Sequence, residues 1–396
     1  MNGNDIVIVS ATRTAIGKFG GQFATTSAIQ LGTTVAKAAI QKANLSPEQI
    51  DTVIFGNVLQ AGLGQNPARQ VGLGAGLNHA STAVTVNEVC GSGLKAIISA
   101  AQAIRLGDAK IVLAGGMENM SLAPHLLQQR FAPKNGPVTL VDSLFNDGLT
   151  DVYSQDAMGI TAENIVEKYG FTREEQDAFA VASQQKAAKA QAEGRFASEI
   201  TPVAVFNRKT KSDDLKVTDE FIRPNTNVES LAGLKPSFKK DGTVTAGNAS
   251  GINDGAACVI MTTREYATEL GLPILATLKG YAEAGVDPSI MGIGPVPAIQ
   301  KLVARTRIPL EKVDVFELNE AFAAQSMAVI KDLNIPTEKV NPFGGAIALG
   351  HPIGASGTRI VVTLINALDQ LDGKIGVASL CVGGGMGVAI AIEREK

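Results

Sequence analysis

The sequence predicts an α/β fold in which one strand-and-helix unit occurs twice, on either side of an inserted segment. The first observation is an internal repeat, because residues 308–320 echo residues 45–57 with Asp314 in the place of Asp51, an offset of 263 positions. The second is that strand-like and helix-like segments alternate around both runs. Such alternation predicts mixed sheets covered by helices, and a repeat of this length indicates a duplicated domain rather than a solenoid.

The elements of the two copies follow in the same order. In the first copy we expect a strand at 6–10, a helix at 28–43, the run at 45–57, a helix from Gly93 to Gly107 and a strand at 110–116. In the second copy we expect a strand at 274–279, a helix at 296–305, the run at 308–320, a helix from Gly357 to about Gly373 and a strand from Ile375. Apolar residues at helical spacing or in short continuous runs carry these assignments.

The inserted segment matches neither copy. Thr172 and Glu175 form a capping box that opens a long helix through Ala192, and Gly194 closes it. The glycine-, serine- and asparagine-rich stretch at 242–255 permits a ligand to approach the backbone closely, although the same composition also makes ordinary turns. We therefore divide the chain into a first half, an inserted loop domain and a second half, at residues 1–120 with 248–270, 121–247 and 271–396.

Charge and cysteine content argue against several classes of protein. The formal net charge is −3 and the sequence pI is about 5.8, so no basic bias indicates a nucleic-acid partner. The three cysteines are scattered without a C-x-x-C pair, so we expect neither a disulfide framework nor a zinc site, and a reducing compartment fits best. No P-loop or Rossmann glycine motif precedes a suitable helix.

No segment of the chain reads as a membrane anchor or a targeting leader. The first predicted strand follows the N-terminal residues directly, without a charged or apolar leader. The apolar run at 377–392 contains four glycines, so it fits buried strands better than a membrane span. We expect a soluble, cytoplasmic protein with no membrane partner.

Three glycine-rich loops carry residues capable of chemistry, namely Cys90, His351 and Cys381. Cys90 directly precedes a predicted helix, whose positive N-terminal end should favour the thiolate and make this cysteine more acidic than a free one. A buried, inert structural cysteine is the alternative. Because the loops occupy related positions in two like halves, packing about a pseudo-twofold axis would bring them together, and Asn319 ends the echoed strand beside them.

The motifs around these residues resemble those of the thiolase family, along the whole chain. They are Asn-Glu-Val-Cys90-Gly-Ser-Gly, Met158-Gly-Ile-Thr-Ala-Glu-Asn164, Thr243-Val-Thr-Ala-Gly-Asn-Ala-Ser-Gly251, Met291-Gly-Ile-Gly-Pro295, Asn319-Glu-Ala-Phe322, Gly344-Gly-Ala-Ile-Ala-Leu-Gly-His351-Pro-Ile-Gly-Ala-Ser-Gly357 and Cys381-Val-Gly-Gly-Gly-Met-Gly387. The resemblance implies a duplicated thiolase fold with five αβαβα layers and an inserted loop domain that holds coenzyme A.

The resemblance also implies an acyl transfer with a role for each residue. Cys90 is acylated by acetyl-CoA while His351 takes its proton, so the reaction is ping-pong. Cys381, with a pKa near neutrality, moves a proton on the second acetyl-CoA, so that acetoacetyl-CoA and CoA form reversibly. Asn319 holds a water for the enolate, and the N–H groups of Cys90 and Gly383 bind the tetrahedral oxyanion. Neither a metal nor another cofactor is implied.

Similarity further assigns residues to coenzyme A binding. It places Arg223 near the adenine and phosphates and Ser250 along the pantetheine, and it counts Ala246 and Phe322 with them. Met158 and Met291 would line the acyl pocket, with simple core packing as the alternative. The segment 141–151 resembles the one that joins dimers into tetramers, so we expect a homotetramer, a dimer of dimers, with a dimer as the fallback.

Some assignments stay open at this stage. Short-chain thiolases commonly carry His-Met-Gly where this chain has Ala157-Met-Gly, so acyl-chain preference is not fixed and a degradative 3-ketoacyl-CoA thiolase is an alternative. A condensing ketoacyl synthase shares the fold but lacks the second catalytic cysteine, so Cys381 argues against it. A non-catalytic acyl-CoA-binding protein would not need the Cys90, Asn319, His351 and Cys381 set. No role follows for Cys258.

Overall fold

The computed structural model describes residues 3–131 and 135–395. The predicted ranges 1–120, 121–247 and 271–396 each include positions outside the described residues, namely 1–2, 132–134 and 396. The division into three domains stays a prediction, whereas the secondary structure within each range is described below.

Nine strands form the main path of one large mixed sheet, in the order β4-β3-β5-β11-β1-β12-β15-β14-β13. The first half supplies β1 (Ile6–Thr14), β3 (Thr52–Gly56), β4 (Thr82–Val86), β5 (Val112–Asn119) and β11 (Asn253–Thr263). The second half supplies β12 (Ala276–Gly285), β13 (Val315–Leu318), β14 (Ile375–Val382) and β15 (Met386–Arg394). Only two residue pairs, Val7 with Thr277 and Ile8 with Ala276, join the halves across β1 and β12.

The two halves repeat the same strand order and direction, which confirms the duplication. β3 pairs with β5 in parallel as β13 does with β14, and β11 and β15 continue each half antiparallel. The place of β4 is taken in the second half by a single parallel bridge between Phe316 and Val340. Even individual hydrogen bonds recur, because Asp51 accepts the N–H groups of Lys110 and Ile111 at 2.7 and 2.9 Å. Asp314 accepts those of the equivalent Lys374 and Ile375 at the same two distances.

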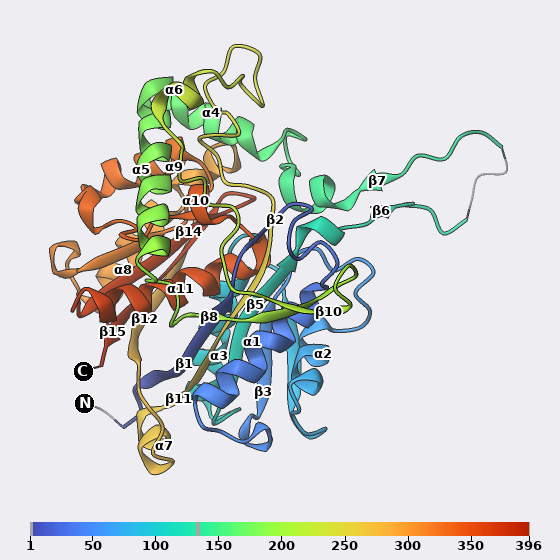
Figure 1. The fold of residues 1–396 in the computed structure, drawn as a ribbon. Helices are drawn as coiled ribbons and strands as arrows, with labels where there is room; N and C mark the ends of the chain where they lie inside the picture. Colours follow the sequence, from blue (N-terminus) through green and yellow to red (C-terminus); the bar gives the residue numbers. More distant parts are fainter. Residues whose placement is uncertain (1–2, 132–134, 396) are drawn as a thin grey trace.

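Helices cover the sheet in three layers (Figure 1). α3 (Ser92–Leu106) and α11 (Ile353–Gln370) share one hydrophobic core with strands of both halves, so they form the middle layer. α1 (Ala28–Lys42) and α2 (Pro67–Gly74) pack on the outer face of the first half, and α8 (Pro295–Thr306) and α9 (Ala323–Leu333) on that of the second. This is the predicted αβαβα arrangement of five layers.

The middle layer exists because its helices are apolar on more than one side. Leu94, Ile97, Ile98, Ala101 and Ile104 of α3 are all buried, as the sequence pattern predicts. In α11 every residue from Ile353 to Leu368 is buried, because a sheet or another helix faces each side. A helix that is apolar all round belongs inside a protein.

The predicted start of the second central helix at Gly357 is wrong, because α11 begins four residues earlier, at Ile353. Gly357 is needed instead for contact with α3. A Cβ added to Gly357 would lie 2.2 Å from the backbone N of Leu94, and one added to Gly93 would lie 2.7 Å from the backbone N of Thr358. The two glycines therefore let the central helices cross at backbone distance.

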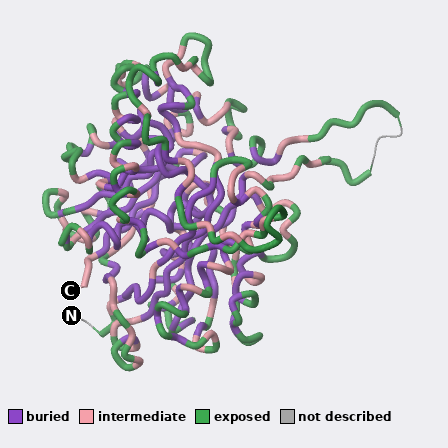
Figure 2. The backbone as a smooth tube through the Cα atoms, in the orientation of Figure 1, coloured by how far each residue is buried: buried purple, intermediate pink, exposed green. Residues whose placement is uncertain are grey.

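The inserted segment caps one end of the layers. It contains α4 (Met158–Tyr169), α5 (Arg173–Ala192), α6 (Val228–Ala232), β6 (His125–Leu126), β7 (Val141–Asp142), β8 (Ile200–Thr201), β9 (Val203–Asn207) and β10 (Ser212–Lys216). α5 opens with the predicted capping box of Thr172 and Glu175. β8 pairs with β1, so the insertion also adds to the main sheet. The arm of β6 and β7 projects from the body and is exposed over most of its length (Figures 1 and 2).

Short elements complete the chain. They are β2 (Gly17–Lys18), α7 (Arg264–Glu269), α10 (Ala346–Leu349), the π-helical turn η3 (Leu144–Leu149) and the 3-10 turns η1 (Pro47–Gln49), η2 (Met120–Leu122), η4 (Pro288–Ile293), η5 (Leu310–Lys312) and η6 (Thr337–Lys339). The apolar run at 377–392 forms β14 and β15, as predicted. Across residues 3–131 and 135–395, no helix has the length and apolar character needed to cross a membrane.

The glycine crossing generates a stability prediction. An alanine in place of a helical glycine ordinarily stabilises by roughly 0.5–1 kcal/mol. Gly357→Ala should instead destabilise by about 1–3 kcal/mol, because its methyl group would overlap the backbone of α3. We expect calorimetry to show a lower melting temperature.

Gly233→Ala is the matched control. Gly233 ends α6 with φ −73°, and the nearest atom to an added Cβ is 4.0 Å away. This substitution should leave the melting temperature unchanged or slightly higher. Equal melting temperatures for the two variants would show that the helices do not depend on the glycine contact.

Candidate active site

The loops that carry Cys90, His351, Cys381 and Asn319 meet at one end of the central helices. Cys90 directly precedes Gly91, the N-cap of α3, and His351 lies two residues before α11. Cys381 is the next-to-last residue of β14, and Asn319 follows β13. The Asn319 Nδ2 and His351 Nε2 atoms are 3.4 Å apart. The Gly383 N–H points at the Cys90 thiol, and the charge of Cys90 acts on Cys381.

The hydrogen bonds of His351 define which ring nitrogen is basic. Nδ1 lies 2.5 Å from the Oγ of Ser356, and this hydroxyl donates to the Pro352 carbonyl at 2.9 Å. Since the hydroxyl has only one proton, Ser356 accepts the Nδ1 proton of His351. Nε2 therefore carries no proton and faces the Asn319 amide nitrogen, an N–H donor, at 3.4 Å. The His351 backbone N–H also donates to Asn253 at 2.9 Å, which holds the loop in place.

His351 is neutral in this setting. It is 5% exposed, and burial together with the positive charge of Arg359 lowers its pKa to about 3. A neutral imidazole with an unprotonated Nε2 is suited to accept a proton from a thiol.

The predicted acidity of Cys90 is wrong. Burial raises the pKa of the Cys90 thiol to about 11, which outweighs the lowering by the N–H groups of Gly383 and Cys90 itself. The predicted near-neutral pKa of Cys381 is wrong as well, because burial and the charge of Cys90 raise it above the ordinary value. Desolvation disfavours the charged thiolate more than the helix terminus favours it. Both thiols therefore carry their protons at neutral pH, and Cys90 needs a base.

The turn before Cys90 is strained, as functional loops often are. Val89 has φ +47°, a left-handed conformation that a β-branched residue rarely adopts. Ser92 holds this turn from both sides, because its hydroxyl donates to the Val89 carbonyl at 2.7 Å and accepts the Glu88 N–H at 2.8 Å. This turn brings Cys90 directly before Gly91, the N-cap of α3.

A cavity of about 470 Å³ reaches His351 from the surface. Six of the residues predicted from the sequence line it, namely Met158, Arg223, Ala246, Ser250, Phe322 and His351. Cys90 packs against Met120 and Ile353, which also line it. Met291 does not line this cavity, because it is 3% exposed and packs in the apolar cluster that also contains Cys381 and Phe322.

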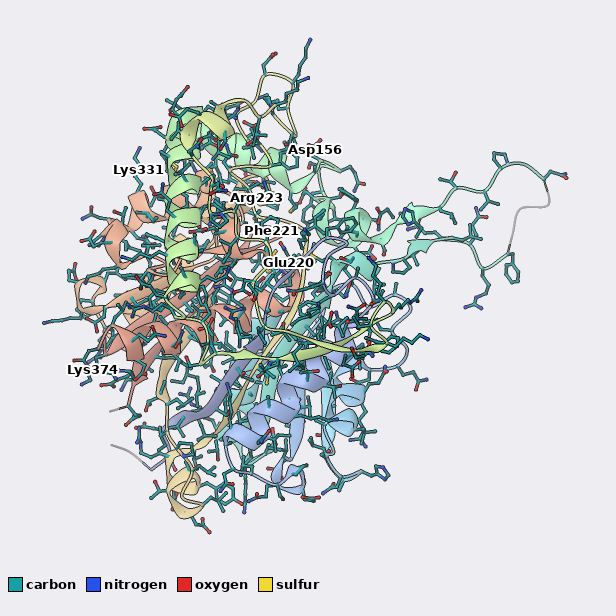
Figure 3. The ribbon with its side chains drawn as sticks, viewed as in Figure 1. Asp156, Glu220, Phe221, Arg223, Lys331 and Lys374 are labelled. Carbon is teal, nitrogen blue, oxygen red and sulfur yellow. The ribbon has the colours of Figure 1, made fainter. Side chains whose placement is uncertain are left out.

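The sequence did not indicate several residues of the cavity wall. Phe221 and Phe238 line it from the charged, aperiodic segment at 207–240. The Arg223 guanidinium lies 5.3 Å from the centre of the Phe221 ring, and both residues lie on the chain between β10 and α6 (Figure 3). Phe238 meets the Phe322 ring edge to face at 6.1 Å. Single aromatic residues in a charged, aperiodic segment carry no sequence signal for this role.

A neutral histidine beside two cysteines is typical of an acyltransferase site, and comparisons with known proteins give the family. Residues 6–265 match the thiolase N-terminal domain, and residues 272–394 match the thiolase C-terminal domain. The chain belongs to the thiolase family. It is 56% identical over 392 residues to an acetyl-CoA acetyltransferase of Cupriavidus necator, covering 99% of this chain and 100% of that one.

Solved structures agree over the full length. The crystal structure of the Bacillus anthracis acetyl-CoA acetyltransferase superposes with a TM-score of 0.96 at 44% identity, covering 99% of each chain. That of human mitochondrial 3-ketoacyl-CoA thiolase superposes with a TM-score of 0.95 at 42% identity, covering 100% of each. The fold therefore does not separate the short-chain enzyme from the 3-ketoacyl-CoA enzyme.

The neutral state of His351 predicts how stability depends on pH. Burial lowers the folded-state pKa to about 3, whereas the unfolded chain binds this proton with a pKa of about 6.5. Between these values the unfolded state binds more protons, so the stability contributed by neutral His351 is complete above pH 6.5 and is lost as the pH falls. At pH 5 the loss from this residue is about 2 kcal/mol.

This prediction is checked with His351→Asn. The melting temperature of the variant should fall less than that of the wild type when the pH is lowered from 7.5 to 5. Replacement of the exposed His79 by asparagine is the control. The melting temperature of this variant should fall by as much as that of the wild type. The prediction is wrong if the melting temperatures of all three proteins fall by the same number of degrees between pH 7.5 and pH 5.

Proposed function

We propose that this thiolase catalyses the reversible Claisen condensation of two acetyl-CoA molecules to acetoacetyl-CoA and CoA. One observation carries the proposal: a neutral histidine and an arginine line one cavity, and Cys90 and Cys381 pack against other residues that line it. The acetyl-CoA acetyltransferases that match this chain over their full lengths support the same activity.

The first half-reaction transfers an acetyl group to Cys90. As the Cys90 sulfur attacks the thioester carbonyl carbon, its proton passes to the unprotonated Nε2 of His351. The carbonyl oxygen becomes an oxyanion that the N–H groups of Cys90 and Gly383 stabilise. The bond to the CoA sulfur then breaks, and the departing thiolate takes the proton of Cys381. Acetyl-Cys90, protonated His351 and a Cys381 thiolate remain.

The second half-reaction forms the carbon–carbon bond. The Cys381 thiolate removes a proton from the methyl group of a second acetyl-CoA, and protonated His351 together with a water held by Asn319 stabilises the enolate oxygen. The carbanion attacks the acetyl carbonyl, the bond to Cys90 breaks, and the Cys90 sulfur recovers its proton from His351. Because the charged thiolate exists only within the cycle, the raised pKa values of the resting thiols are compatible with turnover.

The cavity wall is suited to a CoA thioester. Arg223 supplies a positive charge for phosphates near the Phe221 ring, and Ser250 supplies a hydroxyl for the amides of pantetheine. Met158, Ala246 and Phe322 supply the apolar surface that an acyl chain needs. Ala157 also lines the cavity and leaves the acyl side less filled than a histidine would.

We also propose a homotetramer built as a dimer of dimers. β4 pairs with β3 on one side and forms the edge of the main sheet among the described residues on the other. Its Val84 is 46% exposed, and such an edge favours pairing with a second copy. The projecting arm exposes Leu127, Phe131, Val138 and Leu140, which a second dimer would cover.

Replacing each of the three cysteines by serine tests the catalytic proposal. Cys90→Ser should lower CoA-dependent cleavage of acetoacetyl-CoA at least about a thousandfold, because it removes the nucleophile. Cys381→Ser should still form acetyl-Cys90, detected by mass spectrometry, but more slowly, because serine is a weaker proton donor to the departing CoA. Condensation should fall further, at least about a hundredfold, because serine is too weakly acidic to supply the base for the second acetyl-CoA. Cys258→Ser is the control and should keep its activity, since a hydroxyl also donates to the Val35 carbonyl that Cys258 Sγ contacts at 3.1 Å.

Two outcomes would contradict this assignment. Equal loss of acylation and condensation in Cys381→Ser would contradict the separate roles assigned to Cys90 and Cys381. Faster thiolysis of a long-chain 3-ketoacyl-CoA than of acetoacetyl-CoA by the wild type would replace the short-chain substrate with the longer one.

The arm should control the step from dimer to tetramer. Leu127→Lys and Leu140→Lys together should give dimers in size-exclusion chromatography with light scattering, because lysines disfavour a buried apolar contact. Leu106→Lys, at an exposed leucine on α3, is the control and should stay tetrameric. A tetramer in the arm variant would contradict the role of the arm.

A further inference from the structure

A buried carboxylate behind the site joins the segments that carry the nucleophile and the base. Glu118, on β5, has no exposed surface. Its Oε1 accepts the side-chain N–H of Asn57 at 2.7 Å and the backbone N–H of Leu59 at 3.1 Å. Its Oε2 accepts the backbone N–H groups of Val58 at 3.0 Å and Gly354 at 2.9 Å.

These four donors come from two segments that border the reacting groups. Gly354 lies in the first turn of α11, three residues after His351. Val58 and Leu59 belong to a small apolar cluster with Ile353, and Cys90 packs against that cluster. Glu118 itself is absent from the residues that line the substrate cavity. Its carboxylate therefore touches the framework of both reacting residues without touching the substrate.

We infer that Glu118 is a positioning residue for acyl transfer. Its carboxylate holds the start of α11, and with it His351, at a fixed distance from Val58 and Leu59, whose cluster packs against Cys90. This inference rests on the proposed function, because a register between base and nucleophile matters only if the two exchange a proton. A displacement of about 1 Å between reacting groups is sufficient to cost about a hundredfold in rate.

Only a carboxylate satisfies this position. All four partners are N–H donors, and an ionised carboxylate accepts at both oxygens, whereas an amide would turn one of them into a donor facing two N–H groups. The N-terminal end of α11 also favours a negative charge. Burial raises the pKa of Glu118 to about 7, against the four donors, which lower it.

The charge of Glu118 reaches the nucleophile as well. It raises the pKa of the Cys90 thiol, in the same direction as burial. His351, before α11, and Cys381, on β14, are the titratable groups of the same site, and both are unchanged in a Glu118 variant. A change in the pH profile of Cys90 alkylation would therefore report on the charge of Glu118. Loss of a purely structural contact remote from the thiol would not change this profile.

The test compares Glu118→Gln with a matched control at Asp51, which precedes β3 and accepts the N–H groups of the two residues before β5. In Glu118→Gln, kcat for acetoacetyl-CoA thiolysis should fall about 10- to 100-fold, while KM for CoA changes less than about threefold, because the cavity wall is intact. The rate of Cys90 alkylation by iodoacetamide is measured as a function of pH by mass spectrometry of the Cys90 peptide. The midpoint of this pH profile should shift to lower pH in Glu118→Gln. Asp51→Asn also removes a carboxylate that accepts two backbone N–H groups, and it should change none of these values.

Glu118→Asp covers the case in which the glutamine variant does not fold. It keeps the charge but withdraws the carboxylate, so kcat should fall while the alkylation profile stays closer to that of the wild type than in Glu118→Gln. Retention of kcat within twofold in either variant overturns the inference. The alkylation measurement needs no CoA substrate, so it tests Glu118 even if the wild type fails to cleave acetoacetyl-CoA, a result that would refute the proposed function alone.

Discussion

The backbone contact between α3 and α11 is the constraint on which the rest of the structure depends. The two halves of the main sheet face this central pair, and the helices approach so closely at Gly93 and Gly357 that no Cβ fits between them. Each helix begins beside a reacting residue, Cys90 for α3 and His351 for α11. The distance between nucleophile and base is thus set by helix packing inside the core, which is more rigid than a surface loop.

The interior position of the site explains its electrostatics. Burial keeps His351 neutral and both thiols protonated, so the resting site holds no ion pair between cysteine and histidine. Such a site stores little reactive thiolate, and the nucleophile becomes charged only when a thioester is bound and a proton acceptor is aligned. Ser356 contributes by fixing the tautomer, since its single hydroxyl proton is already given to the Pro352 carbonyl.

The layered fold and the meeting of four site residues could be predicted from the sequence, because the repeat relates positions that lie far apart in the chain. The acidity of Cys90 could not, since a helix terminus is visible in a sequence while the desolvation that outweighs it is a property of the packed core. The start of α11 was misplaced because Gly357 looks like a helix boundary, whereas its role is close contact with α3. Phe221 and Phe238 were missed because their segment has no periodicity, and only the tertiary fold places them on the cavity.

The strand junction between the halves is narrow, so the halves depend on their shared helices. Only two residue pairs link β1 to β12, whereas α3 and α11 share one hydrophobic core with strands of both halves. The registers of β5 on β3 and of β14 on β13 place Met117 where the other half has Cys381. A thioether has no proton to exchange. Cys90 belongs to the first half, whereas His351 and Cys381 belong to the second, so neither half holds the whole site.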